Sequence, residues 1–361
     1  MYNLMLEINR KCNLRCNYCY LGDKDNKEMN KEVFEKVINI FIREALKHND
    51  KTIFISFIGG EPLLDFNKII SFVESIEEKC RDNELKCFFG VTTNGTLLNK
   101  EIIDYLIWKR FDLKVSLDGS KTAHDKNRVF YDGTGSHFFI IDNIKQILRY
   151  EDESGKKCVI ANVITPNNVE FLTSSLSYIY SLGFKILESG INIYDNWVPE
   201  KVNVLKDELL NSFRLYKTIK NRGDSFTWAY IDNKLRTYFS EKCFYRCKAG
   251  LYSSYVDLEG NIYTCDTIPD FKIGDYKKGL DYVRIREIIC NEDRAIDICK
   301  SCKYVNKCDA RSCFTKNFRI NNNIYVPVKI NCIETKLLSN IFDCELEQNQ
   351  KDIFKNYFCT K

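Results

Sequence analysis

The stretch RKCNLRCNYCY at residues 10–20 decides how the rest of this chain is interpreted. It places Cys12, Cys16 and Cys19 in one short loop with the spacing C-x3-C-x2-C, and no further cysteine or histidine follows before His48. Structural zinc sites close their tetrahedron with four protein ligands, whereas a four-iron cluster held by three thiolates keeps one iron free for another ligand. The loop therefore predicts an open metal site that performs chemistry. A zinc site completed by a distant ligand, or three unrelated buried thiols, is the alternative.

A buried strand is predicted just before this loop, because residues 4–8 form a short and mostly apolar run. Parallel α/β barrels place their chemistry at the carboxyl ends of their strands. With Tyr18 as the aromatic residue, the C-x3-C-x-aromatic-C loop resembles the signature of radical S-adenosylmethionine (SAM) enzymes. The resemblance implies a 4Fe-4S cluster on the three cysteines. It also implies that this cluster binds SAM and cleaves it to methionine and a 5'-deoxyadenosyl radical, which abstracts hydrogen from a substrate.

The composition agrees with a large intracellular enzyme. The chain has 361 residues with 44% hydrophobic content, enough for one large domain and a smaller one. Its net charge of +4, from 54 basic and 50 acidic residues, gives no argument for nucleic acid. Neither a secretion signal nor a membrane span is indicated, so we expect a cytoplasmic protein without membrane association. Seventeen cysteines in such a chain favour metal ligation over disulfides.

Strand and helix patterns alternate through the first 225 residues. Beyond the first strand, further strands are predicted at 52–58, 86–91, 113–117, 158–164 and 185–187. Helices are predicted between and after them at 31–47, 67–79, 100–108, 140–150, 169–182 and 206–220. This rhythm predicts an α/β fold with a parallel sheet and helices outside it. Six strands are too few for a closed eight-stranded barrel, so we expect a partial parallel (βα)6 barrel over residues 1–225, as in radical SAM enzymes.

A second motif, IGGEPLL at residues 58–64, follows the second predicted strand. Two glycines allow a backbone to approach a ligand closely, and a carboxylate beside them can accept from an ammonium group. The motif resembles the GGEP element of the family, which implies that Gly59, Gly60 and Glu61 bind the amino group of SAM. An ordinary strand-to-helix turn is the alternative.

Two further strand ends carry short polar side chains. Asn94 lies in TTNGT at residues 92–96, and Ser116 and Asp118 lie in SLDG at residues 116–119. Similar sequences line the SAM pocket of the family, although Asn-Gly and Asp-Gly also suit plain turns. The run HDKNR at residues 124–128 resembles an H-D-x-x-R element of peptide-modifying members. A local ion pair between Asp125 and Arg128 explains it equally well, and we assign it no catalytic role.

The composition changes beyond about residue 240, and ten cysteines lie from Cys243 to Cys344. Thiolates at such spacing suit iron-sulfur clusters, or zinc in a ribbon-like fold. Residues 226–361 resemble the Cys-rich SPASM domain of radical SAM enzymes, which carries two auxiliary 4Fe-4S clusters and would here end in a helix. The resemblance assigns the first auxiliary cluster to Cys243, Cys247, Cys265 and Cys313. It assigns the second to Cys299, Cys302, Cys308 and Cys332.

One departure affects this assignment, since four residues separate Cys308 from Cys313 where the family usually has three. Eleven cysteines would thus hold three 4Fe-4S clusters, with SAM as the further cofactor. The other six are interpreted as buried small hydrophobes or incidental thiols: Cys80, Cys87, Cys158, Cys290, Cys344 and Cys359.

Asp266, directly after Cys265, is the candidate catalytic acid. Sulfatase-maturing members of the family carry an acidic residue there that is thought to deprotonate the substrate, and a carboxylate can serve as a general base. A hydrogen bond that orients the cluster loop is the alternative.

Together these features are most similar to enzymes that oxidise or crosslink ribosomally made peptides or protein side chains. An anaerobic sulfatase-maturing enzyme, which forms formylglycine from Cys or Ser, is the second interpretation. A non-enzymatic iron-sulfur or zinc-binding protein would explain the cysteines but not the GGEP motif or the repeated βα units. The expected partners are a peptide or protein substrate and an electron donor such as flavodoxin or ferredoxin. Because the first predicted strand begins within a few residues of Met1, we expect leader recognition by the barrel rim or by a separate leader-binding protein, or a substrate without a leader.

Overall fold

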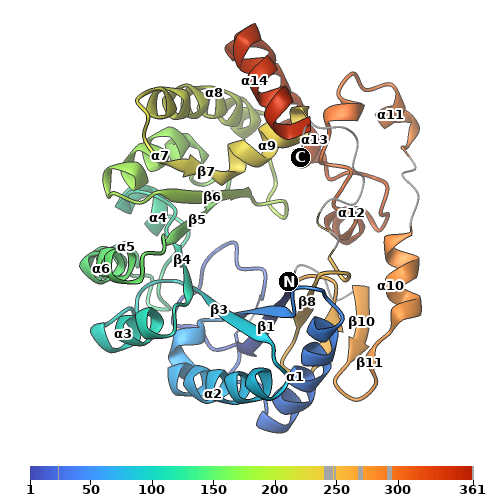
Figure 1. Cartoon of the computed structure of the whole chain (residues 1–361). Helices are drawn as coiled ribbons and strands as arrows, with labels where there is room; N and C mark the ends of the chain where they lie inside the picture. The colour runs from blue at the N-terminus through green and yellow to red at the C-terminus, as the bar shows by residue number, and fades with distance from the viewer. Residues whose placement is uncertain (23, 240–246, 248, 267–270, 291–294, 360–361) are drawn as a thin grey trace. The chain divides into compact units, whose positions relative to one another are not determined.

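The computed structural model describes residues 1–22, 24–239, 247, 249–266, 271–290 and 295–359 (Figure 1). Its contacts divide the chain into two units. Unit 1 comprises Met1–Leu117, Arg128–Cys158 and Cys247–Asn291. Unit 2 comprises Asp118–Asn127, Val159–Arg246 and Glu292–Lys361. Both units draw residues from either side of the predicted boundary at 225–226, which stays a prediction.

A mostly parallel sheet forms the centre of unit 1. Its strands are β1 (Tyr2–Asn9), β2 (Thr52–Gly59), β3 (Lys86–Thr93), β4 (Asp112–Ser116), β8 (Ser253–Val256), β9 (Asn261–Tyr263), β10 (Lys272–Asp275) and β11 (Gly279–Leu280). They lie in the order β11-β10-β9-β8-β1-β2-β3-β4. β1 pairs in parallel with β2 on one side and with β8 on the other, where Asn3 lies opposite Ser253. The first strand is therefore interior, and its far-side partner comes from the carboxyl-terminal half of the chain.

Helices cover the strands of unit 1. They are α1 (Lys31–Leu46), α2 (Phe66–Asp82), α3 (Lys100–Trp108), α5 (His137–Asp142), α6 (Ile144–Ser154) and α10 (Tyr282–Ile289). Figure 1 shows α1, α2 and α3 beside strands β1 to β4. α1 begins where the Asn30 side chain accepts a hydrogen bond of 2.7 Å from the backbone N–H of Glu32, which satisfies one of the helix's free donors.

The core of unit 1 follows the two-residue period of its strands. Leu4, Leu6 and Ile8 of β1 are fully buried. A row of stacked rings extends the core, because Phe89 lies 6.3 Å from Phe57 and 5.5 Å from Phe111 between ring centroids. Burying such side chains supplies about 1.5–3 kcal/mol each relative to leaving them exposed. The same alternation directs polar side chains of β1 to its other face.

Unit 2 continues the βα pattern and ends in helices. Its elements are α4 (Lys121–Asp125), β5 (Val159–Ile164), α7 (Leu172–Ser181), β6 (Ile186–Ile191), α8 (Pro199–Asn221), β7 (Thr227–Trp228), α9 (Ala229–Phe239), α11 (Asp297–Lys300), α12 (Phe314–Asn321), α13 (Lys329–Glu345) and α14 (Gln348–Cys359). The strands pair in parallel in the order β5-β6-β7.

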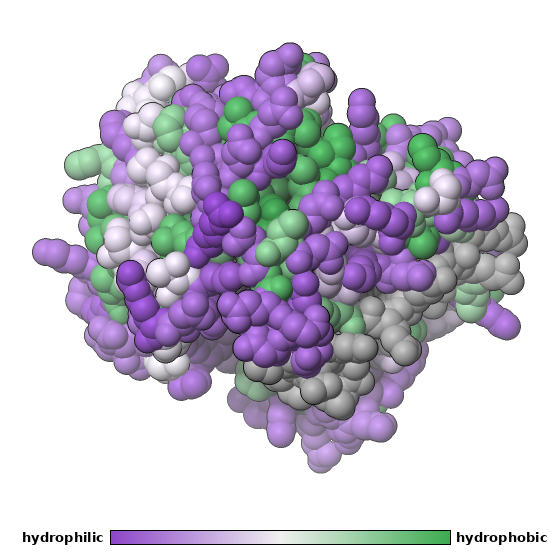
Figure 2. All heavy atoms as spheres, turned by 90° about the horizontal axis from the view of Figure 1, so that it is seen from above, coloured by the Kyte–Doolittle hydropathy of each residue, from purple (hydrophilic) through white to green (hydrophobic). Residues whose placement is uncertain are grey.

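The predicted strands and helices of the first 225 residues are confirmed, most of them within a few residues of the expected bounds. The largest difference is α8, which begins at Pro199 rather than near residue 206 because proline suits the first turn of a helix. Among the helices that the structure describes, none is both long and apolar enough to cross a membrane. Figure 2 shows a face on which hydrophilic and hydrophobic side chains alternate in small patches.

Candidate functional site

The cysteine loop leaves the carboxyl end of β1, as predicted. Leu14 anchors it, since this side chain is fully buried and its backbone bridges Phe130 in an antiparallel pair. The next residue, Arg15, donates its backbone N–H to the carbonyl of Val129 at 2.8 Å. Cys12, Cys16 and Cys19 are each partly exposed on this anchored loop.

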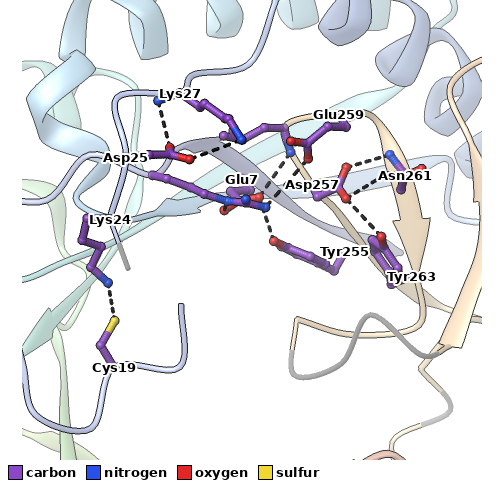
Figure 3. Close-up of polar contacts among 12 residues, drawn as sticks. Glu7, Cys19, Lys24, Asp25, Lys27, Tyr255, Asp257, Glu259, Asn261 and Tyr263 are labelled. Carbon is purple, nitrogen blue, oxygen red and sulfur yellow. Dashed lines mark hydrogen bonds and ion pairs between the residues drawn. The ribbon is translucent and has the colours of Figure 1, made fainter. Parts of the chain in front are cut away.

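Hydrogen-bond donors lie beside the sulfurs of Cys12 and Cys19. The Leu14 backbone N–H lies 3.4 Å from Sγ of Cys12, and Nζ of Lys24 donates to Sγ of Cys19 (Figure 3). Burial raises the pKa of the Cys12 thiol to about 11, to which the nearby Glu61 and Cys16 contribute. A bound metal removes the proton of such a thiol, and hydrogen bonds to sulfur are a feature of iron-sulfur sites. The donor set therefore fits a cluster held by three thiolates.

The two glycines of the GGEP motif are explained by contact with the start of this loop. A Cβ atom on Gly59 would lie 2.3 Å from the carbonyl oxygen of Asn9, and one on Gly60 would lie 2.0 Å from that of Lys11. The backbone that approaches closely is thus the chain's own, where the sequence predicted a ligand. Any further role of the glycines toward a cofactor stays a prediction.

Glu61 is the buried acid of this region, with 1% of its surface exposed. One carboxylate oxygen accepts from Oγ1 of Thr93 at 2.7 Å, and the other accepts from the backbone N–H of Asn94 at 2.7 Å. Burial raises the pKa of Glu61 to about 7, against these hydrogen bonds and the charge of Arg128, which lower it. The carboxylate is therefore held at the ends of β2 and β3, close enough to Cys12 to act on its pKa.

Asn94 links the end of β3 to the cysteine loop. Its Nδ2 donates to Oδ1 of Asn13 at 2.8 Å and lies 4.0 Å from Sγ of Cys12. The structure thus brings Glu61 and Asn94 together with Cys12, as the sequence predicted for one site. A cavity of about 550 Å³ lies on the same loop and is lined by Asn13, Thr96 and the rings of Phe130, Tyr131 and Phe139.

Ser116 and Asp118 are both buried at the end of the fourth strand region. Asp118 belongs to unit 2, where its Oδ1 accepts from the backbone N–H of Val163 at 3.0 Å. Its own backbone N–H donates to Nδ1 of His124 at 3.1 Å, which gives the histidine of the H-D-x-x-R element a structural partner. Roles of Ser116 and Asp118 toward a cofactor stay predictions.

Tyr18 contacts Arg128, which the sequence grouped with the H-D-x-x-R element. The guanidinium lies 5.2 Å from the centroid of the Tyr18 ring, within the range of a cation–π contact. The aspartate of the element, Asp125, pairs with Lys121 one turn earlier at 2.6 Å.

The carboxyl-terminal cysteines fall in both units. Cys243 lies outside the described residues, Cys247 and Cys265 lie in unit 1, and Cys313 lies in unit 2. All members of the second predicted set lie in unit 2. Burial raises the pKa of Cys332 to about 11, and the charges of the three other members, Cys308, Cys299 and Cys302, add to the shift. These four thiols therefore lie near one another.

Within the described residues, no three Cys, His, Asp or Glu side chains meet closely enough to hold a single metal ion. A four-iron cluster spreads its ligands more widely, because each thiolate binds a different iron. Of the cysteines outside the predicted sets, Cys80 and Cys158 are buried as expected of small hydrophobes, whereas Cys290 and Cys344 are exposed.

Asp266 lies in unit 1 just after β9 and is partly exposed. Burial raises the pKa of the Tyr20 hydroxyl, and the charges of Asp266, Cys19 and Glu7 add to the shift. The candidate general base is therefore within electrostatic reach of the residue that follows the cysteine loop's last thiol.

Sequence reasoning missed Glu7, the single acid in the apolar run of β1. It is 1% exposed, and burial raises its pKa although Arg10, Tyr255 and Leu258 all act to lower it. Its carboxylate accepts from Nε of Arg10 at 3.2 Å and from the hydroxyl of Tyr255 at 2.9 Å (Figure 3). The signal was visible in the sequence, since an acid within a buried strand needs a partner.

Comparison with known proteins places these features in a family. Residues 6–167 match the model of the radical SAM superfamily. The chain is 29% identical over 272 residues to an uncharacterised protein of Methanocaldococcus jannaschii, covering 74% of this chain and 86% of that protein. It is 25% identical over 320 residues to a cysteine-type anaerobic sulfatase-maturating enzyme of Clostridium perfringens, covering 82% and 84%.

Solved structures show the same fold. The structure of anSMEcpe with bound AdoMet matches with a TM-score of 0.78 at 20% identity, over 98% of this chain and 99% of that one. Streptococcus suis SuiB bound to the precursor peptide SuiA matches with a TM-score of 0.61 at 18% identity, over 92% and 75%. The predicted α/β fold with a mostly parallel, barrel-like sheet is confirmed.

Proposed function

The chain is a radical SAM enzyme, and we propose that it is a maturase that oxidatively modifies or crosslinks a side chain of a ribosomally made peptide or of a protein. The observation that carries this proposal is the assembly around Cys12, where the cysteine loop, Glu61 and Asn94 meet at the ends of parallel strands. Its relatives include sulfatase-maturating enzymes and a radical SAM cyclopropyl synthase, which supports the proposal.

The residues of the first site have distinct tasks in this proposal. Cys12, Cys16 and Cys19 hold a 4Fe-4S cluster, which when bound supplies the electron that cleaves SAM. Lys24 and the Leu14 N–H stabilise the thiolates, because a donor or positive charge beside sulfur favours its ionised form.

SAM would be held by the residues around the cysteine loop. Glu61 would accept a hydrogen bond from the amino group of SAM. Tyr18 and the backbone at Gly59 and Gly60 would lie beside that group. Asn94, Ser116 and Asp118 carry short polar side chains, and we propose each of them as a further contact of SAM. Since Glu61 is buried and already fixed by Thr93 and Asn94, it needs no rearrangement to present a carboxylate.

We further propose that residues 226–361 form a SPASM domain with two auxiliary 4Fe-4S clusters, which brings the total to three. The grouping of Cys299, Cys302, Cys308 and Cys332 within unit 2 supports the second of them. The first rests on Cys243, Cys247, Cys265 and Cys313.

The partners follow from this chemistry. The substrate is a peptide or a protein side chain, and one-electron reduction requires a donor such as flavodoxin or ferredoxin. A separate protein that binds a leader peptide is a further expected partner. We propose that the enzyme works in the cytoplasm, where such donors are present.

The test is anaerobic reconstitution with iron and sulfide, followed by reduction with dithionite in the presence of SAM and a synthetic peptide. We expect 5'-deoxyadenosine, together with a peptide whose mass has changed at one side chain. Absence of 5'-deoxyadenosine from a preparation with full iron content would refute the proposal.

Sulfatase maturation is the second candidate, and Asp266 beside Cys265 favours it, together with the sulfatase-maturating relatives. As the general base for oxidation of a Cys or Ser side chain, Asp266 would accept the proton that the substrate loses. Asp266→Asn should then keep SAM cleavage and iron content while formylglycine formation on a sulfatase peptide falls about a hundredfold or more. A loss of iron in proportion to activity would instead assign Asp266 to support of the cluster loop.

A further inference from the structure

Glu7 is a buried carboxylate whose partners come from two distant parts of unit 1. Its Oε1 accepts from Arg10, two residues before Cys12. Its Oε2 accepts from the Tyr255 hydroxyl at 2.9 Å and from the backbone N–H of Leu258 at 3.2 Å. One side chain of β1 therefore holds both the entry to the cysteine loop and the hairpin formed by β8 and β9.

The contacts continue through this hairpin toward Asp266. Asp257 accepts from the backbone N–H of Asn261 at 2.8 Å and from the Tyr263 hydroxyl at 3.1 Å, which fixes the turn between the two strands (Figure 3). Tyr263 ends β9, and Cys265 and Asp266 follow after Thr264. Arg10 also lies 3.8 Å from Glu259 at the tip of the same turn.

Packing alone does not account for an acid at this position. Leu4, Leu6 and Ile8 already bury the other face of β1 completely. A buried charge must lose its hydration, so an apolar residue of similar volume often stabilises a fold at least as well. The carboxylate fixes the positions of its neighbours, because it accepts three hydrogen bonds from groups that would otherwise be free to shift.

We propose that Glu7 is a positioning residue that fixes the Cys12–Cys16–Cys19 loop relative to the segment carrying Cys265 and Asp266. The inference rests on the proposed function, in which the first segment starts the radical reaction and the second completes it on the substrate. When the two segments keep their correct relative position, each cleaved SAM leads to one modified side chain. When they are not, SAM is cleaved without product.

The test compares Glu7→Gln and Tyr255→Phe with Tyr2→Phe as a matched control. Tyr2 forms the same kind of buried hydrogen bond between β1 and β8, to Oγ of Ser254 at 2.7 Å, but at the end of β1 that is remote from the cysteine loop. A purely structural role predicts similar effects for all three variants. Tyr255→Phe also keeps the proposal testable if Glu7→Gln does not fold.

The first readout is the ratio of modified sulfatase-type cysteine peptide to 5'-deoxyadenosine, at equal iron content. We expect this ratio to fall about tenfold in Glu7→Gln and Tyr255→Phe, because each variant loses a hydrogen bond to a charged group. In Tyr2→Phe the ratio should change less than twofold. Equal ratios in wild type and all three variants would overturn the proposal.

The second readout needs no peptide and therefore separates this proposal from the proposed function. We expect the EPR signal of the reduced, SAM-bound cluster to broaden in Glu7→Gln and Tyr255→Phe and to match wild type in Tyr2→Phe. If wild type cleaves SAM but modifies no peptide, the proposed substrate class fails while the EPR comparison still decides the role of Glu7. Unchanged spectra in all variants would refute that role.

Discussion

The cysteine loop of unit 1 and the four cysteines Cys299, Cys302, Cys308 and Cys332 of unit 2 are held in place in different ways. The loop leaves a buried strand, and the ends of β2 and β3 provide its neighbours. The second set sits on short helical turns and on α13, rather than at the end of a described strand.

A largely buried ion network lies beside the second set of cysteines in unit 2. Nζ of Lys234 lies 2.9 Å from Asp309, which follows Cys308, and 2.8 Å from Glu334 on α13. Burial alone would lower the pKa of Lys234, but the charges of Glu334 and Asp309 raise it above its usual range. A sheet fixes a loop through many backbone hydrogen bonds, whereas a network of this kind depends on single side chains. The first site should therefore tolerate changes around it better than the second.

The largest effect is expected from the cysteine loop itself. Replacing Cys12, Cys16 and Cys19 together by Ala should abolish SAM cleavage, because no thiolate remains to hold the cluster that reduces SAM. Iron should fall from about twelve to about eight per chain if three cubanes are present. Production of 5'-deoxyadenosine by the triple variant would contradict the assignment of the first site.

The next largest effect should come from Lys234→Met, which leaves the buried Glu334 and the partly exposed Asp309 without their cation. Breaking a buried pair in this way typically destabilises a fold by about 3–5 kcal/mol. We expect a lower unfolding midpoint in urea and loss of about four irons. Lys36→Met, at an exposed pair with Glu32, is the control and should leave both quantities unchanged. Full iron content in Lys234→Met would show that the network does not support the second set.

A smaller effect is expected from pH at the first site. The pKa of Glu61 is raised from 4.5 to about 7, so the folded protein holds mostly neutral Glu61 below pH 7 and mostly carboxylate above it. Only the carboxylate pairs with the ammonium group of SAM, which stays largely protonated below pH 7.7. Between pH 6 and pH 7.5 the ionised fraction of Glu61 rises from about a tenth to about three quarters, so SAM affinity should increase about eightfold. Equilibrium dialysis should show this rise, and Glu61→Gln should remove it.

The smallest effect is predicted for the exposed thiols Cys290 and Cys344. Their replacement by Ser should change neither iron content nor 5'-deoxyadenosine yield, because they belong to neither predicted set. A loss of about four irons in either variant would show that the replaced cysteine binds a cluster and that the predicted ligand sets are wrong.

Local patterns predicted much of this structure. The alternation of apolar residues located β1 to β6, and the order of strand and loop placed the cysteine loop, Glu61 and Asn94 at one edge of a parallel sheet. This succeeded because each of these features depends on residues close in sequence.

Contacts between distant residues were not predictable in the same way. Nothing in the sequence near Glu7 indicates Tyr255 as its partner, and nothing near Lys234 indicates Asp309. The glycines of the GGEP motif were correctly singled out for close approach, but the sequence could not show that the approaching group is the backbone of Asn9 and Lys11. Such pairings are decided by the tertiary fold.

The parallel pairing of β1 with β8 has a consequence for synthesis. Asn3 and its partner Ser253 are 250 residues apart, so at about 5–20 residues per second the ribosome needs roughly 10–50 s to deliver the second strand after the first. During that time one edge of β1 presents unpaired N–H and C=O groups, which is the kind of edge on which chains aggregate. Nascent chains stopped before residue 253 should therefore bind chaperones more than those stopped after residue 256.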